Sequence, residues 1–129
     1  MHEFMVECGK EAARAAIADG CTLVPIFGLT DKDVTGPDQY AEDLLGEVLE
    51  RFSRPDTLTT VLQDWMKGRR AEVEDVNGLV VKVLEGQGEK APHNARTVEL
   101  ATRIEAGTWN GVATTSTCCW GPRATTHRR

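Results

Sequence analysis

The chain has 129 residues, of which 40% are hydrophobic and 27% are charged, and its formal net charge is -5. This length suits one domain with a modest core. The negative charge argues against nucleic acid as the main partner, and no apolar run approaches the roughly 20 residues that a membrane helix needs. We therefore expect a protein that binds neither nucleic acid nor a membrane.

The N-terminus and the cysteines predict a cytoplasmic protein without a metal site. The first residues lack the basic region and apolar core of a secretory signal. The cysteines form no C-x-x-C pair, and only three histidines accompany them, which argues against zinc. Cysteines without a disulfide framework are typical of a reducing compartment. They are Cys8, Cys21, Cys118 and Cys119.

Two helices are predicted in the first half of the chain. Residues 5–19 are rich in alanine, and Gly20 follows where a left-handed cap is expected. Residues 38–52 carry a single apolar stripe at helical period and end before Pro55. Between them, the apolar segment 21–30 contains a proline and a glycine. It fits either a short buried strand or, as we favour, a packed connection.

Two further helices are predicted in the second half. One should run to Lys67, with Asp56 or Thr57 as its N-terminal cap. The other should run to Glu105, with Asn94 as its cap.

Residues 72–84 fit two structures. Asn77–Gly78 between valine-rich flanks is typical of a hairpin with strands at 72–76 and 79–83. The spacing of the valines and the acidic first turn favour a helix instead. The residues alone do not decide between the two.

The segment between the third and fourth predicted helices carries functional groups of three kinds. Thr60 offers a hydroxyl, Gly68–Arg70 a basic turn, and Glu72 a carboxylate. If they lie at one corner, they could orient a small anionic keto acid and the sugar of a cofactor. Alternatively, these are ordinary surface residues and Glu72 is a favourable first-turn acid. We assign no catalytic residue and no metal ligand, since no standalone catalytic motif is present.

The order and spacing of these residues are similar to a known family signature. T-V-L-Q-D, then G-R, E-V-E and N-G resemble the S-M-L-Q-D, G-R and T/P-E-I-D-x-x-N-G segments of ketopantoate reductases (2-dehydropantoate 2-reductases). A P-x-N motif and an E-x-x-x-V-A-x-A-x-G helix of that family also have counterparts, so the resemblance covers about residues 5–106. The matching segments are Thr60–Asp64, Gly68–Arg69, Glu72–Glu74, Asn77–Gly78, Pro92–Asn94 and the helix Val6–Gly20.

The resemblance implies an all-α fold, a bundle of about five helices like the C-terminal domain of ketopantoate reductase (6-phosphogluconate dehydrogenase C-terminal-like). It implies that Thr60, which replaces the family's serine, contacts the keto-acid substrate. It also implies that Glu72 helps to hold substrate or cofactor. Ala71 departs from the family's threonine or proline. The family uses NADPH and can form homodimers.

Two parts of such an enzyme have no counterpart in this chain. The family's catalytic lysine lies in a K-x-x-x-N pattern, but Lys10 is followed by Arg14 at that spacing. Lys90 and Asn94 have the spacing but fall after the signature and enclose Pro92. The N-terminal Rossmann domain that binds NADPH is also absent, so we expect no cofactor on this chain alone.

We therefore predict a helical domain at residues 1–108 and a flexible tail at 109–129. Its expected function is that of the C-terminal domain of a ketopantoate-reductase-like enzyme, as a fragment or truncated product that is inactive alone. The full enzyme would reduce 2-dehydropantoate to pantoate in coenzyme A synthesis. Two alternatives stay open: a free-standing helical module that self-associates, and the same domain of a reductase for another 2-keto acid.

Overall fold

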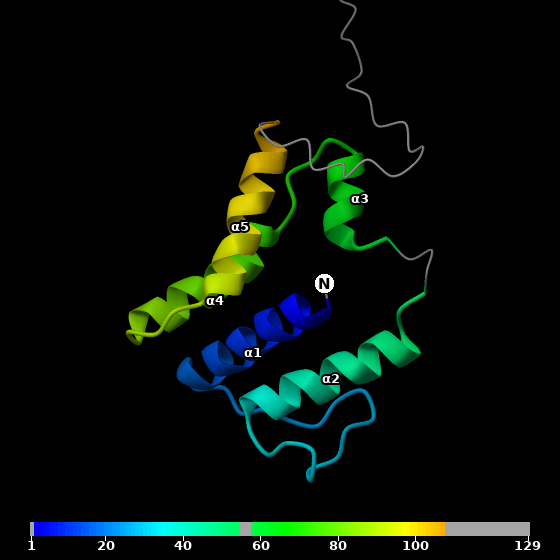
Figure 1. Cartoon of the computed structure of the whole chain (residues 1–129), viewed down its shortest axis with the longest axis vertical. Helices are drawn as coiled ribbons and strands as arrows, with labels where there is room; N and C mark the ends of the chain where they lie inside the picture. The colour runs from blue at the N-terminus through cyan, green and yellow to red at the C-terminus, as the bar shows by residue number, and fades with distance from the viewer. Residues whose placement is uncertain (1, 55–57, 108–129) are drawn as a thin grey trace, which may run out of the picture.

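A computed structural model describes residues 2–54 and 58–107. Within these ranges the fold is all-α, with five helices and no strand, as predicted. The central element is α1, which contacts α2 on one side and α4 and α5 on the other (Figure 1). The helices are α1 (His2–Ala18), α2 (Pro37–Arg51), α3 (Thr60–Met66), α4 (Val73–Gly86) and α5 (Pro92–Glu105).

Small side chains allow α1 to lie at the centre. Ala13 packs with Tyr40 and Ala41 of α2, whereas Ala15 packs with the fully buried Leu84 of α4. Residues two positions apart on a helix point about 200° apart, so these two alanines face opposite neighbours. Because alanine projects so little, both neighbouring layers can approach the α1 backbone closely.

The end of α1 follows the prediction. Gly20 has a φ of 86°, in the left-handed region that favours glycine. Its N–H donates to the Ile17 carbonyl at 2.9 Å, and the Cys21 N–H donates to the Ala16 carbonyl at 2.9 Å. This pair of bonds satisfies carbonyls that the end of the helix leaves free.

The hairpin interpretation of residues 72–84 is wrong, because α4 is a continuous helix that contains Asn77–Gly78. Helical spacing places Val73 and Leu84 in the core. Several valines between them pack against the core cluster that contains Leu84. Burial of this face against α1 and α5 outweighs the local turn preference of Asn-Gly.

The predicted start of α3 is wrong. The helix begins at Thr60, and the side chain of Thr59 caps it by accepting a hydrogen bond from the Leu62 N–H at 3.2 Å. The predicted cap residues, Asp56 or Thr57, lie within residues 55–57, which are outside the described residues. A threonine closer to the helix therefore supplies the cap.

The predicted cap of α5 is also wrong. The helix begins at Pro92, with Ala91 at the cap position, so Asn94 lies within the first turn. Proline suits a first helical position because its missing N–H would have no partner there. The side chain of Asn94 instead bonds to groups on α1 and α4, as described below.

The segment between α1 and α2 is a packed connection, as we favoured. Its Leu23 and Leu29 pack against the cluster around Tyr40, whose hydroxyl donates to the Val24 carbonyl at 3.0 Å. The predicted tail, residues 109–129, lies outside the described residues, and the domain boundary at 108 stays a prediction.

Candidate functional site

The α3–α4 turn, residues 67–72, reverses the chain after α3. Gly68 has a φ of 68°, and the Arg69 N–H donates to the Asp64 carbonyl at 2.8 Å. A left-handed glycine with such a bond is typical of a helix C-terminal cap. The turn leaves the side chain of Arg69 exposed.

Thr60 is the first residue of α3, and its side chain is exposed. The seven residues of α3 rise about 10 Å along the helix axis, so Thr60 lies at the opposite end of α3 from Gly68. Among the described residues, no side-chain hydrogen bond engages Thr60, in contrast to its neighbour Thr59. The hydroxyl of Thr60 is therefore accessible, but it is not part of the turn itself.

Glu72 is the N-cap residue of α4 and is exposed. It was predicted at the start of this helix, and the structure places it there. Its carboxylate makes no capping bond, and no described residue pairs with it. By contrast, the preceding residue, Ala71, is only 5% exposed and packs with Val73 and Ala101.

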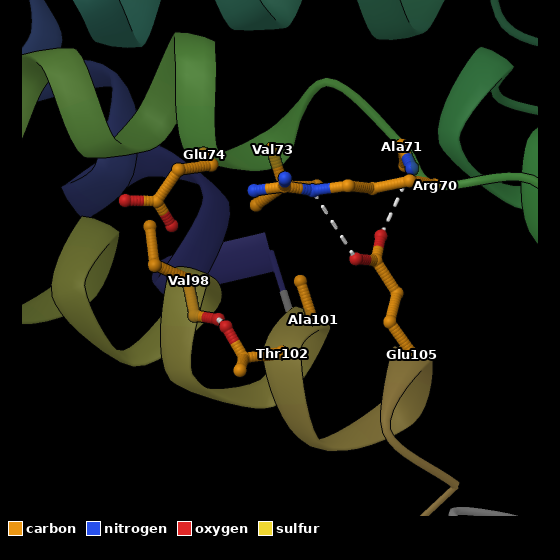
Figure 2. Close-up of a pocket in the computed structure, with 8 residues that line it drawn as sticks. All are labelled: Arg70, Ala71, Val73, Glu74, Val98, Ala101, Thr102 and Glu105. Carbon is orange, nitrogen blue, oxygen red and sulfur yellow. Dashed lines mark hydrogen bonds and ion pairs between the residues drawn. The ribbon is translucent and has the colours of Figure 1, made fainter.

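A residue that the sequence did not indicate, Glu105, holds the α3–α4 turn against α5 (Figure 2). Its Oε1 accepts hydrogen bonds from the Ala71 N–H at 2.9 Å and from the Trp65 indole N–H at 3.0 Å. Its Oε2 lies 3.7 Å from Nε of Arg70. These contacts lower the pKa of Glu105, first through the bond from Ala71 and then through the bond from Trp65.

The space inside this corner is too small for a substrate. The cavity lined by the turn and α5 has a volume of about 10 Å³, enough for roughly one water molecule. A shallower groove of about 280 Å³ lies between α4 and α5, beside Glu74 and Gly78. A nucleotide such as NADPH needs a larger enclosed site, so the described residues do not fit it on their own. A ligand at Thr60 or Glu72 would lie against the outer surface.

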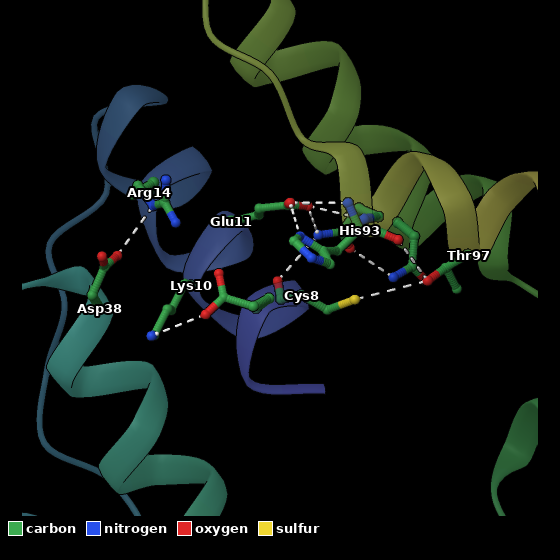
Figure 3. Close-up of polar contacts among 10 residues, drawn as sticks. Cys8, Lys10, Glu11, Arg14, Asp38, His93 and Thr97 are labelled. Carbon is green, nitrogen blue, oxygen red and sulfur yellow. Dashed lines mark hydrogen bonds and ion pairs between the residues drawn. The ribbon is translucent and has the colours of Figure 1, made fainter. Parts of the chain in front are cut away.

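A second polar cluster joins α1 to the start of α5 (Figure 3). Glu11 is only 2% exposed, and its two carboxylate oxygens accept four hydrogen bonds. The His93 N–H and Nδ1 lie 3.0 and 2.7 Å from Oε1, and the Asn94 N–H and Nδ2 lie 2.9 and 2.7 Å from Oε2. The carboxylate thus satisfies donors in the first turn of α5, where the helix dipole also favours negative charge.

Burial and hydrogen bonding oppose each other at Glu11. Burial raises the pKa of its carboxyl group, but the bonds from Asn94 and His93 together outweigh burial, and the net pKa is lowered. The neighbouring Cys8 shows the simpler case, in which burial raises the pKa of the thiol. Glu11 is therefore held as a charged group inside the protein.

Neither lysine that was compared with the family's catalytic lysine points to such a role. Lys10 forms an ion pair with Glu7 of the same helix at 3.0 Å and one with Glu42 at 2.6 Å that links α1 to α2. Lys90 is exposed in the connection between α4 and α5. Lys10 therefore has the position of a structural residue, and Lys90 has that of a surface residue.

Comparison with known families identifies the chain. The model of the family described as ketopantoate reductase PanE/ApbA C terminal matches residues 1–105. The chain belongs to this family. No curated protein and no solved structure matches it.

The second polar cluster brings together several of the residues on which the resemblance to ketopantoate reductases rests. Asn77, of the N-G motif, donates from Nδ2 to Oδ1 of Asn94, of the P-x-N motif, at 2.8 Å. Asn94 in turn donates to the Cys8 carbonyl at 3.1 Å and to Glu11, which occupies the glutamate position of the E-x-x-x-V-A-x-A-x-G helix. These motif residues connect α1, α4 and α5 and so have a structural explanation.

The described residues contain neither a membrane-spanning helix nor a metal-ligating cluster. None of their helices combines the length and the hydrophobicity needed to cross a membrane. The same residues contain no group of three or more potential metal-ligating side chains arranged to hold an ion.

Proposed function

We propose that this chain forms the substrate side of a ketopantoate-reductase-like oxidoreductase that reduces 2-dehydropantoate to pantoate with NADPH. The family match over residues 1–105 carries this proposal. It is supported by the exposed side chains of Thr60 and Glu72, to which the family resemblance assigns contact with the substrate and with substrate or cofactor, respectively. Neither side chain is hydrogen-bonded within the described part of the chain, in contrast to Thr59 and Glu105, so both can bind a ligand.

The chemistry of the two side chains suits this role. The hydroxyl of Thr60 can donate a hydrogen bond to a carboxylate or keto oxygen, and Glu72 can accept one from a substrate or ribose hydroxyl. Arg69, exposed in the same turn, adds positive charge for an anionic keto acid. The nicotinamide supplies the hydride, and in our proposal a separate nucleotide-binding domain holds it.

The exposed apolar surface of α3 is suited to contact with a partner domain or with a second copy of the chain. This helix buries none of its residues, and Leu62 and Met66, one helical turn apart, are 40% and 51% exposed; Leu58, which precedes the helix, is 44% exposed. Exposed apolar side chains at helical spacing are typical of an interface. We therefore propose that this chain is part of a cytoplasmic enzyme in which a nucleotide-binding domain or a second copy of the chain covers α3.

A two-part assay tests the proposal. The chain is mixed with a segment of a ketopantoate reductase that carries both the nucleotide-binding domain and the catalytic lysine, association is confirmed by sedimentation, and NADPH oxidation is followed after addition of 2-dehydropantoate. We expect turnover with both parts and none with the chain alone. An associated pair that oxidises no NADPH with this substrate, or rapid oxidation by the chain alone, would refute the proposal. Turnover with another 2-keto acid only would assign the chain to the related reductases.

The same apolar surface of α3 favours a second candidate, a self-associating module without catalysis. Sedimentation of the chain alone would then show a stable dimer that Leu62→Lys dissociates. If the chain bound the nucleotide-binding domain in preference to a second copy of itself, this second function would be excluded.

A further inference from the structure

The last residue of α5, Glu105, is placed where a carboxylate does not stabilise its own helix. The C-terminal end of a helix carries partial negative charge, so a glutamate there is unfavourable unless other groups compensate. The compensating donors come from outside α5: the Trp65 indole in α3 and the Ala71 N–H just before α4. The side chain of Glu105 is 23% exposed; its bond from the Ala71 N–H is partly buried, whereas its bond from the Trp65 indole is exposed.

The two donors lie on either side of the basic segment Gly68–Arg70, with Trp65 before it and Ala71 after it. Ala71 is buried and immediately precedes Glu72, so the bond to its N–H constrains the backbone that carries the Glu72 side chain. Trp65 belongs to α3, which buries no residue and therefore depends on its few contacts for its position. The N-terminus of α4 has no side-chain cap of its own.

We propose that Glu105 is a positioning residue that fixes the α3–α4 turn and thereby the place and direction of Glu72. Its contacts hold α3, the turn and α5 in one arrangement around a cavity of only about 10 Å³. The consequence for a keto-acid substrate rests on the function proposed above, whereas the positioning itself does not. Glu105 acts through Ala71 and Trp65 and need not touch the substrate.

Nuclear magnetic resonance of the 129-residue chain tests this role without a substrate. The indole N–H signal of Trp65 is assigned by its loss in Trp65→Phe. In Glu105→Ala we expect this signal to move and the Ala71 amide to exchange about tenfold faster, because its hydrogen bond is lost. Glu105→Gln keeps an acceptor oxygen and should restore most of the protection. Glu99→Ala is the matched control, since Glu99 pairs with Arg96 and Arg103 on α5 itself.

Exchange at Leu84, at the buried end of α4, separates positioning from general stability. We expect its protection to be unchanged in Glu105→Ala. Unchanged signals of Ala71 and Trp65, or equally faster exchange at Leu84, would overturn the proposal. Local loosening combined with no turnover in the two-part assay would refute the proposed function and keep the positioning role. Turnover in that assay combined with unchanged amide exchange at Ala71 in Glu105→Ala would support the proposed function and refute the positioning role.

Discussion

Replacing Glu11 by alanine removes the acceptor of four hydrogen bonds at the junction of α1 and α5. Two of the donors belong to Asn94, which is 1% exposed, so water cannot readily replace the lost carboxylate there. The other two belong to His93, whose side chain is 35% exposed and can be hydrated. The main cost of the substitution therefore comes from Asn94.

The size of the effect follows from these two buried donors. An unsatisfied buried donor costs about 1–3 kcal/mol, so two donors with some relaxation lower the free energy of unfolding by about 3 kcal/mol. For a domain of this size that corresponds to a fall in Tm of about 12 °C. Glu11→Gln keeps one acceptor oxygen and should cost about half as much.

Urea and thermal unfolding, followed by circular dichroism, measure this cost. Glu7→Ala is the matched control, because Glu7 lies one turn earlier on α1 and forms an i,i+3 ion pair with Lys10, which keeps its second partner Glu42. It should change the free energy of unfolding by less than about 1 kcal/mol. The reasoning fails if Glu11→Ala is no more destabilising than Glu7→Ala.

Three further predictions concern acid and two helix ends. The lowered pKa of Glu11 means that its stabilising contribution is complete above the ordinary glutamate pKa of about 4.3 and is lost as the pH falls through the folded pKa. Acid titration should therefore destabilise Glu11→Gln less than the unmodified chain, and equal losses would contradict this. Thr59→Ala should cost about 1 kcal/mol in urea unfolding and Thr60→Ala less than about 0.5 kcal/mol, since only Thr59 caps α3; equal costs would exclude that cap. Gly20→Ala should lower the free energy of thermal unfolding by about 1–2 kcal/mol because of its left-handed φ, and a neutral result would be inconsistent with that conformation.

Local patterns were sufficient for α1, α2 and the glycine that ends α1, whereas the all-α class also depended on the family resemblance. They were insufficient where a side chain serves a distant partner. Asn94 has the chemistry of an N-terminal cap, but its amide is engaged by α1 and α4 instead. The Asn-Gly pair in α4 has a strong turn preference, and only the packing of its valines against α1 and α5 decides for a helix.

The candidate site could be predicted in part. The position of Glu72 at the start of α4 follows from the helix pattern, whereas the start of α3 at Thr60 was not predicted. Glu11 and Glu105 could not be found in this way, because an isolated glutamate on a helix resembles a surface residue. Their donors are 34 to 83 residues away in the sequence, so only the tertiary structure shows them.

The central claim, that Glu72 contributes to a substrate site completed by a nucleotide-binding domain, is tested most directly by kinetics of the two-part enzyme. Loss of a hydrogen bond to a charged group costs about 1.5–3 kcal/mol, so Glu72→Gln should lower kcat/KM for 2-dehydropantoate by about 10- to 100-fold. Asp75→Asn, which removes an exposed carboxylate from the first turn of the same helix, should leave kcat/KM nearly unchanged. Equal kcat/KM values for Glu72→Gln and the unmodified chain would contradict the account.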